Sequence, residues 1–247
     1  MTVDILTVFP EMFESVFSAS ILGRAREQGL LDVRLTDIRA FSAAKHKNTD
    51  DYPFGGGAGM VMTAQPILDA MAAVSASLPN ARRIFLGPRG RKLTSALARE
   101  LAAEESLILL CGHYEGVDQR ALDACIDEEI SIGDYILTGG ELAAMVLTDC
   151  VARFIPGVLG CAESPEEESF SDGLLEYPQY TRPRDLDGRL VPEVLLNGDH
   201  AKIRAWRRRE SLRATLRFRP DLLETADLSP EDLKMLKELE NECSSES

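Results

Sequence analysis

The most constraining feature of this sequence is the alternation of short apolar segments and helix-like stretches over its first 160 residues. The apolar segments occupy residues 3–9, 32–38, 82–88, 106–112 and 128–133, and the helix-like stretches cover residues 64–78, 94–105 and 141–154. Strands that are apolar along nearly their whole length are typical of a parallel sheet that is buried by helices on both faces. The sequence therefore predicts an α/β fold with a parallel sheet.

Glycine-rich loops follow three of these segments. They span Leu86–Leu93, Cys111–Asp118 and Ser131–Ala144, and a fourth loop spans Tyr52–Val61. Ligands of such sheets bind beyond the carboxyl ends of the strands, and glycines let the main chain approach a ligand closely. None of the loops has the pattern of a nucleoside-triphosphate or dinucleotide site. We interpret them as a site where main-chain groups bind an adenine and ribose, with plain turns at strand ends as the alternative.

The pattern changes after residue 160. Residues 161–180 contain many turn formers and little periodicity, which is typical of a linker. A basic helix-like stretch follows, and then an acidic one that opens with the helix-start signal Ser229-Pro230. We therefore expect an α/β cofactor-binding domain at residues 1–160, an interdomain linker at residues 161–180 and a small helical domain at residues 181–247.

The charge is distributed unevenly along the chain. The net charge of −14 argues against a nucleic-acid partner, but residues 180–220 contain eleven basic and five acidic side chains, a net charge of +6. Because salt screens charges over about 10 Å, a locally basic segment can bind phosphates whatever the total charge is. The candidates for phosphate contacts are Arg204, Arg207, Arg208 and Arg209.

Six longer motifs make the sequence recognisable. In chain order they are DYPFGGGAGMV, GHYEGVDQR, SIGDYILTGGELAAM, VARFIPGVLG, SFSDGLLEYPQYTRP and GDHAKIRAWR. In this order they resemble the bacterial tRNA (guanine-N1)-methyltransferase family of the SPOUT class, and the resemblance covers nearly the whole chain. It implies a SPOUT domain with a C-terminal trefoil knot, a small α-helical tRNA-binding domain, and a homodimer with active sites at the subunit interface. The implied reaction transfers a methyl group from S-adenosylmethionine to N1 of guanine 37, next to the anticodon of tRNA.

The resemblance also assigns residues to the cofactor. By matched position, the cofactor-binding residues are Pro88, Gly112, Glu115, Ile132, Gly133, Asp134, Tyr135, Ile136, Leu137, Gly139 and Gly140. Residues of these types suit an adenine, which binds in an apolar slot lined by main-chain hydrogen bonds. The resemblance makes a role for Mg²⁺ plausible as well, although the sequence supplies no ligand set.

The chemistry requires two further groups. Guanine N1 carries a proton at neutral pH, so methylation needs a base, and charge that develops on O6 needs a cation. Arg153 matches the catalytic arginine of the family, and its alternative is a cation at a helix C-terminus. Glu168 stands where the family has aspartate, and its extra methylene shifts the carboxylate by about an ångström. Asp172 is the rival carboxylate, and a solvated acidic linker is the simpler interpretation of this stretch.

Other positions have weaker assignments. His46 and Asp50 match family contacts to the tRNA or the target base, with a polar surface loop as the alternative. Trp206 either stacks on a base or anchors a helix, and we favour packing. The five cysteines form no C-x-x-C pair, and the chain has no apolar run long enough to span a membrane and no signal-peptide pattern. We therefore expect a cytoplasmic protein.

Two other functions are compatible with parts of this pattern. One is a SPOUT-type methyltransferase that acts on a different RNA site. The other is a non-catalytic RNA-binding protein that has lost its chemistry, but such a protein is expected to have a damaged cofactor loop or to lack Arg153. Both features are intact in this chain.

Overall fold

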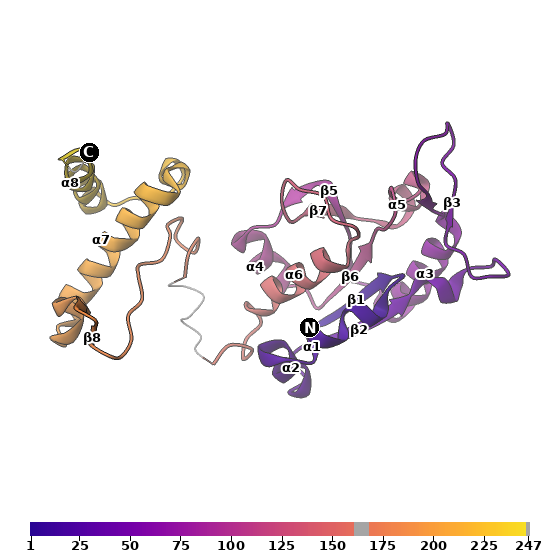
Figure 1. Cartoon of the computed structure of the whole chain (residues 1–247). Helices are drawn as coiled ribbons and strands as arrows, with labels where there is room; N and C mark the ends of the chain where they lie inside the picture. Colours follow the sequence, from indigo (N-terminus) through magenta and orange to yellow (C-terminus); the bar gives the residue numbers. More distant parts are fainter. Residues whose placement is uncertain (161–167, 246–247) are drawn as a thin grey trace. The chain divides into compact units, whose positions relative to one another are not determined.

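The structure is a computed structural model that describes residues 1–160 and 168–245. Residues 1–160 belong to one compact unit and residues 168–245 to a second (Figure 1). The first seven residues of the predicted linker lie outside the described residues, and residues 168–180 belong to the second unit. No helix in the described ranges is long and apolar enough to cross a membrane.

The first unit is built on a five-stranded sheet with the order β2-β1-β6-β5-β7, in which all neighbours are parallel. The strands are β1 (Thr2–Thr7), β2 (Asp32–Asp37), β5 (Arg82–Lys92), β6 (Ser106–Cys111) and β7 (Glu128–Ser131). The central strand β6 is buried at every position, as its sequence SLILLC requires. The predicted parallel sheet is thus confirmed.

Helices cover both faces of this sheet (Figure 1). Leu107, Leu109 and Cys111 of β6 face a core that contains α1 (Glu14–Phe17), α2 (Ser20–Glu27), α4 (Ser95–Ala102) and α6 (Glu141–Ala152). The alternate residues Ile108 and Leu110 face α3 (Ala64–Ser77) and α5 (Gln119–Cys125). Each fully buried Leu or Ile side chain contributes about 1.5–3 kcal/mol, so this double core is the main source of stability.

Strand β5 leaves its partner β7 and then returns to it. Both Leu86 and Arg91 pair with Ile130, so the intervening residues 87–90 form a bulge at the carboxyl end of the sheet. Gly90 passes so close to β7 that a Cβ there would lie 2.2 Å from the carbonyl carbon of Glu129. A side chain at this position would therefore push the two strands apart.

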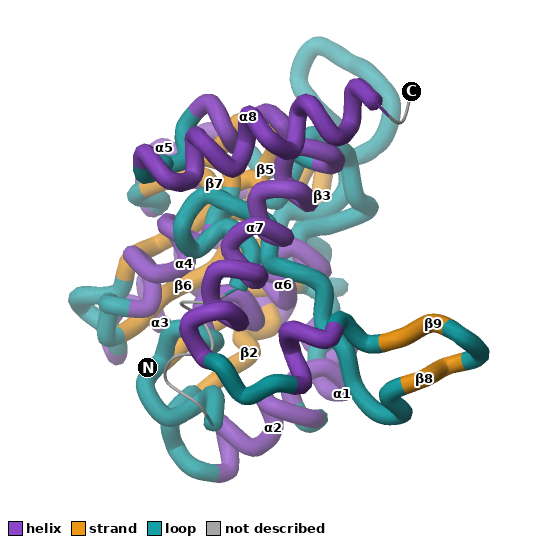
Figure 2. Tube along the Cα trace, turned by 90° about the vertical axis from the view of Figure 1, so that its left-hand side faces the viewer, coloured by secondary structure: helices purple, strands orange, loops and turns teal. Residues whose placement is uncertain are grey.

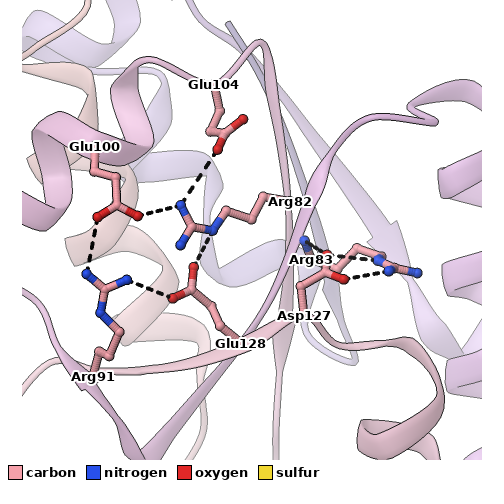
Figure 3. A network of polar contacts seen from close by, with 7 residues as sticks. All are labelled: Arg82, Arg83, Arg91, Glu100, Glu104, Asp127 and Glu128. Atoms are coloured by element: carbon pink, nitrogen blue, oxygen red, sulfur yellow. Dashed lines mark hydrogen bonds and ion pairs between the residues drawn. The ribbon is translucent and has the colours of Figure 1, made fainter.

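An ion-pair network joins the edge of the sheet to helix α4 (Figure 3). Arg82 Nη1 contacts Glu100 Oε1 at 2.7 Å, and the same guanidinium pairs with Glu128. Arg91 contacts the same two carboxylates, with Nη2 at 3.1 Å from Glu100 Oε2 and Nη1 at 3.5 Å from Glu128 Oε2. The network therefore ties the start of β5 and the residue just after its bulge to α4 and β7.

A short antiparallel pair, β3 (Asp50–Asp51) and β4 (Val61–Met62), flanks the first glycine loop. Tyr52 and Phe54 in this loop are 80% and 99% exposed. The loop therefore presents aromatic side chains to solvent, which is unusual for a plain turn.

The second unit contains two longer helices, α7 (His200–Phe218) and α8 (Pro230–Ser245), which pack on each other (Figure 2). A small hairpin of β8 (Asp185–Leu186) and β9 (Arg189–Leu190) precedes α7 along the chain. Asp199 caps α7 by accepting hydrogen bonds from the amides of Ala201 and Lys202, at 3.1 and 3.2 Å. The buried core residues of this unit are Leu174, Leu212, Leu236 and Leu239.

Candidate functional site

The bulge of β5 and the loops at the carboxyl ends of β6 and β7 enclose one pocket of about 150 Å³ in the first unit. Ten of the eleven residues that the sequence assigns to the cofactor line it. They are Pro88, Gly112, Glu115, Ile132, Gly133, Tyr135, Ile136, Leu137, Gly139 and Gly140. The loops lie at the sheet edge where ligands of parallel sheets bind, as expected from the strand order.

Asp134 is the eleventh of these residues, and it does not line the pocket. Its side chain is 86% exposed, and its Oδ2 accepts a hydrogen bond from Lys92 Nζ at 2.9 Å. Lys92 is the last residue of β5, so this ion pair links the bulged strand to the loop that follows β7. A cofactor contact by Asp134 stays a prediction.

Main-chain contacts join two of the loops directly. The amide of Gly140 donates to the carbonyl of Gly112 at 2.8 Å, and Gly139 forms an antiparallel bridge with His113. A Cβ on Gly140 would lie 2.8 Å from Cys111 Cα and 3.0 Å from the amide nitrogen of Gly112. These glycines are therefore needed for the close approach of the two loops, which shapes one side of the pocket.

The remaining pocket wall is mainly apolar. Phe85 and Leu86 line the pocket from β5 just before its bulge, Ile130 lines it from β7, and Ala143 lines it from α6. An apolar slot with main-chain donors and acceptors at its rim suits a planar heterocycle such as adenine, whose edge hydrogen-bonds and whose faces are apolar. The residues present thus fit the nucleoside part of a bound S-adenosylmethionine.

A buried polar group lies beside the pocket, and sequence reasoning missed it. Glu141, the first residue of α6, is 1% exposed and accepts a hydrogen bond from Thr7 Oγ1 at 2.9 Å. Its Oε2 lies 3.7 Å from Nδ1 of His113, which also lines the pocket, and the ring of Phe9 lies 4.7 Å from that imidazole. Within the described ranges, the buried Nδ1 of His113 has no hydrogen-bond partner.

The position of Glu141 has a physical explanation. A helix N-terminus stabilises a carboxylate, and Glu141 immediately follows the N-cap residue Gly140. Burial, together with the charge of Glu141, raises the pKa of the Cys111 thiol well above its usual value. A glutamate at the start of an otherwise apolar helix was the one sequence signal that could have revealed this group.

The proposed catalytic residues come from different units. Arg153 is half-buried in the first unit, where it ends α6 and donates its backbone amide to the carbonyl of Asp149 at 3.4 Å. This position agrees with the helix C-terminal alternative as well as with a catalytic cation. Glu168 is half-buried in the second unit.

In the second unit, Glu168 lines a pocket together with the three arginines Arg204, Arg207 and Arg208 that the sequence predicts to bind tRNA. The Arg207 guanidinium lies over the ring of Tyr177, 4.7 Å from its centre. The rival carboxylate Asp172 lines the same pocket, but it pairs with Arg208 and accepts a hydrogen bond from the Leu174 amide at 3.2 Å. Asp172 therefore has a structural function within its turn.

Comparison with known proteins decides the family. The family model described as tRNA (Guanine-1)-methyltransferase TrmD matches residues 1–225. The chain belongs to this family. The resemblance predicted from the motifs is thus confirmed.

Curated relatives match over the full length of the family's chains. Proteins named tRNA (guanine-N(1)-)-methyltransferase from Moorella thermoacetica and Geobacillus kaustophilus are both 56% identical to this chain, over 243 and 242 residues. These matches cover 97% and 98% of this chain and 96% and 99% of the relatives. The protein of that name from Geotalea uraniireducens is 54% identical over 246 residues and is covered completely.

The two residues that match family contacts in the glycine-loop region differ in their surroundings. His46 is exposed, whereas Asp50 is half-buried in β3. Burial, and next the charge of Asp50, raises the pKa of Tyr114, which lines the pocket of the first unit. Asp50 is therefore close enough to a pocket residue to influence it, and contacts of both residues with tRNA stay predictions.

Two other predictions concern Trp206 and Mg²⁺. Trp206 is half-buried, and its ring lies 6.2 Å from that of Tyr180, in agreement with a packing function. Among residues 1–160 and 168–245, no group of three or more His, Cys, Asp and Glu side chains is arranged to hold a metal ion. Participation of Mg²⁺ stays a prediction.

Proposed function

We propose that this chain transfers the methyl group of S-adenosylmethionine to N1 of guanine 37 in tRNA, next to the anticodon. The observation that carries this proposal is the pocket between the β5 bulge and the loops after β6 and β7, where ten of the eleven cofactor residues matched to the family come together. Its glycines permit main-chain contacts, and its apolar walls suit an adenine.

The reaction assigns one role to each of the two catalytic residues. When bound, S-adenosylmethionine supplies an electrophilic methyl group on sulfur. Guanine N1 forms the new bond to this methyl carbon as the carbon–sulfur bond breaks, and Glu168 takes the N1 proton. Arg153 stabilises the negative charge that develops on O6. The family's aspartate is replaced by glutamate at position 168, so the turn that carries it has to accommodate one additional methylene.

The proposal includes the finer architecture that the resemblance implies. The pocket loops would form a trefoil knot, the helical residues 181–247 would bind tRNA, and two copies of the chain would form a cytoplasmic homodimer with active sites at the interface. Two observations support these features. The loops are joined by main-chain contacts between Gly140 and Gly112, and α6 exposes the apolar side chains of Leu142 and Val146, four residues apart on one face.

Mapping the modified nucleotide tests the reaction. A tRNA transcript with guanines at positions 36 and 37 is incubated with enzyme and S-adenosylmethionine, digested, and analysed by mass spectrometry. We expect one additional methyl group, on N1 of guanine 37, and none in a transcript with adenine at position 37. Methylation at another site would favour a SPOUT-type enzyme with a different RNA target. Failure to bind S-adenosylmethionine in calorimetry would favour a non-catalytic RNA-binding protein.

Substitution of Glu168 tests the assignment of the base. Glu168→Ala should abolish methylation, because no carboxylate remains to take the N1 proton, and should leave the affinity for S-adenosylmethionine nearly unchanged. Glu168→Asp, which restores the side chain usual in the family, should retain or raise activity. Single-turnover methyl transfer and calorimetry measure the two quantities. An active Glu168→Ala enzyme would show that another group is the base.

A further inference from the structure

Arg208 of helix α7 contacts two carboxylates through three of its nitrogens. Its Nε and Nη2 donate to the two carboxylate oxygens of Asp232 at 2.8 and 2.9 Å, and its Nη1 donates to Asp172. Asp232 is 5% exposed and also accepts hydrogen bonds from the amide and hydroxyl of Ser229, which immediately precedes α8. Arg208 therefore connects three segments of the second unit: α7, the start of α8, and the turn that contains Asp172.

This turn, residues 168–176, is the segment that carries Glu168. The Phe170 amide donates to the Leu174 carbonyl at 2.7 Å, and Leu174 is 1% exposed within the leucine core. The Leu175 amide donates to Thr215 Oγ1 of α7 at 2.9 Å, and Thr215 is fully buried. The contacts described that fix the turn on the helices of the second unit are thus the buried Leu174 side chain, the hydrogen bond of the Leu175 amide to α7, and the ion pair of Asp172 with Arg208.

The three donors of Arg208 reach two carboxylates from one planar group. A lysine could not reproduce this arrangement, because its ammonium has no rigid fork of donors. The Arg208 side chain is also only 30% exposed, so a nucleic-acid phosphate would have to compete with partners that are already in place. Arg204 lines the same pocket but is exposed, so it is better placed to contact a phosphate.

We infer that Arg208 is a positioning residue for methyl transfer: through Asp172 and Asp232 it holds the turn that carries Glu168, and it does not bind tRNA phosphate. This inference rests on the proposed function of Glu168 as the base. It replaces the role that the sequence predicts for Arg208. Because a base misplaced by about 1 Å can lose about 100-fold in rate, the orientation of this turn should be visible in kcat.

The test compares Arg208→Gln and Asp172→Asn with Arg213→Gln. Arg213 lies on the same helix and pairs with Glu210 and Glu242, so its substitution removes a similar charge and similar ion pairs outside the turn. We expect Arg208→Gln to lower kcat about 10- to 100-fold, with the tRNA dissociation constant and its salt dependence unchanged. Asp172→Asn should give a smaller loss in the same direction, and Arg213→Gln should retain the wild-type kcat.

Asp172→Asn keeps the Arg208–Asp232 pair, so it decides the matter if Arg208→Gln does not fold. A folded Asp172→Asn enzyme with unchanged kcat would overturn the inference. So would an Arg208→Gln enzyme with normal kcat, weaker tRNA binding and a salt slope reduced by about one, which is the signature of a lost phosphate contact.

A measurement without substrate separates this inference from the proposed function. Hydrogen exchange of the Leu174, Leu175 and Glu176 amides should accelerate in Arg208→Gln and Asp172→Asn, but not in Arg213→Gln. Unchanged exchange would show that Arg208 does not hold the turn. If the wild-type enzyme fails to methylate guanine 37 while exchange responds as expected, only the proposed function is wrong.

Discussion

The first unit buries apolar side chains on both faces of a parallel sheet, whereas the apolar core described for the second unit consists of four leucines. The second unit compensates with charged contacts. Arg208 binds Asp172 and Asp232, and Arg209 and Arg213 both contact Glu242 of α8 at 2.6 and 3.0 Å. The structure of the first unit thus depends mainly on apolar burial, and that of the second depends more on ion pairs.

This difference changes how the charge pattern of the sequence is interpreted. The net charge of +6 between residues 180 and 220 counts every arginine of α7, yet acidic side chains from elsewhere in the second unit neutralise several of them. Local net charge therefore overestimates the positive surface offered to RNA. The comparison also indicates that small changes in the backbone of the first unit should strongly lower the affinity of its pocket for a ligand. Changes in pH and salt should alter mainly the stability of the second unit.

The largest effect is expected from Gly140→Ala. The added Cβ would lie 2.8 Å from Cys111 Cα, so it would clash with main chain that cannot move without disturbing β6. We expect the affinity for S-adenosylmethionine to fall about 100-fold, because the loops of the pocket separate. Calorimetric titration of the folded variant measures this.

Two variants calibrate that result. At Gly160 a Cβ would meet no described atom within 4 Å, so Gly160→Ala should bind like the wild type. At Gly139 the nearest atoms belong to the side chains of Glu141 and His113 and not to main chain, so Gly139→Ala should show an intermediate loss. Wild-type affinity in Gly140→Ala would mean that the pocket backbone is less rigid than the comparison implies.

Much of the first unit could be predicted from its sequence. The segments 32–38, 106–112 and 128–133 contain β2, β6 and β7, and β1 begins one residue before the segment 3–9, because short apolar runs ended by turn formers are typical of buried strands. The segment 82–88 became a longer strand, since β5 bulges at Gly87–Gly90 and pairs with β7 again at Arg91. The pair Gly87-Pro88 predicts a turn, and only the renewed pairing with β7 shows that the strand continues.

What the sequence did not predict depends on contacts between distant residues. Helices α1, α2 and α5 are short, and such helices are set by packing more than by local preference. The hydrogen bond between Thr7 and Glu141 joins positions 134 residues apart. The ion pairs of Arg208 arise in the same way, so its side chain looked like any other arginine of a basic helix.

A smaller effect is expected from acidification of the second unit. The guanidinium of Arg208 and the hydrogen bonds from Ser229 lower the pKa of Asp232 from 3.8 to about 2. Because the folded pKa is depressed, this carboxylate stabilises the fold fully above about pH 4, and its contribution is lost as pH falls through about 2. The difference in unfolding free energy between the wild type and Asp232→Asn should therefore be constant above pH 4 and shrink below it.

Trp206 makes this measurement specific, because it is the only tryptophan of the chain and belongs to the second unit. Urea unfolding followed by its fluorescence, between pH 2 and pH 6, gives the free energy at each pH. Asp187→Asn is the control, since Asp187 is exposed in the β8–β9 turn. A wild-type advantage over Asp232→Asn that grows at low pH would contradict the assigned direction of the pKa shift.

The smallest effect is expected at the ionic edge of the first unit. Arg82 is 23% exposed and contacts Glu100, Glu104 and Glu128, so Arg82→Gln should lower the unfolding free energy by about 1 kcal/mol. Arg34 is 48% exposed, and among the contacts described its ion pair is with Asp32 on the same strand, β2. Arg34→Gln should therefore lower the unfolding free energy by less than about 0.5 kcal/mol. Hydrogen exchange of the β6 amides, which open only when the sheet unfolds, measures both.

The response of these variants to salt distinguishes two explanations of the network. If Arg82 acts through charge, raising the salt concentration to 1 M should reduce the deficit in unfolding free energy of Arg82→Gln, because the Debye length falls to about 3 Å. If Arg82 acts by packing its aliphatic stem beside α4, the deficit should persist in salt. Equal, negligible deficits for Arg82→Gln and Arg34→Gln would show that apolar burial alone stabilises the first unit, which would widen its contrast with the second.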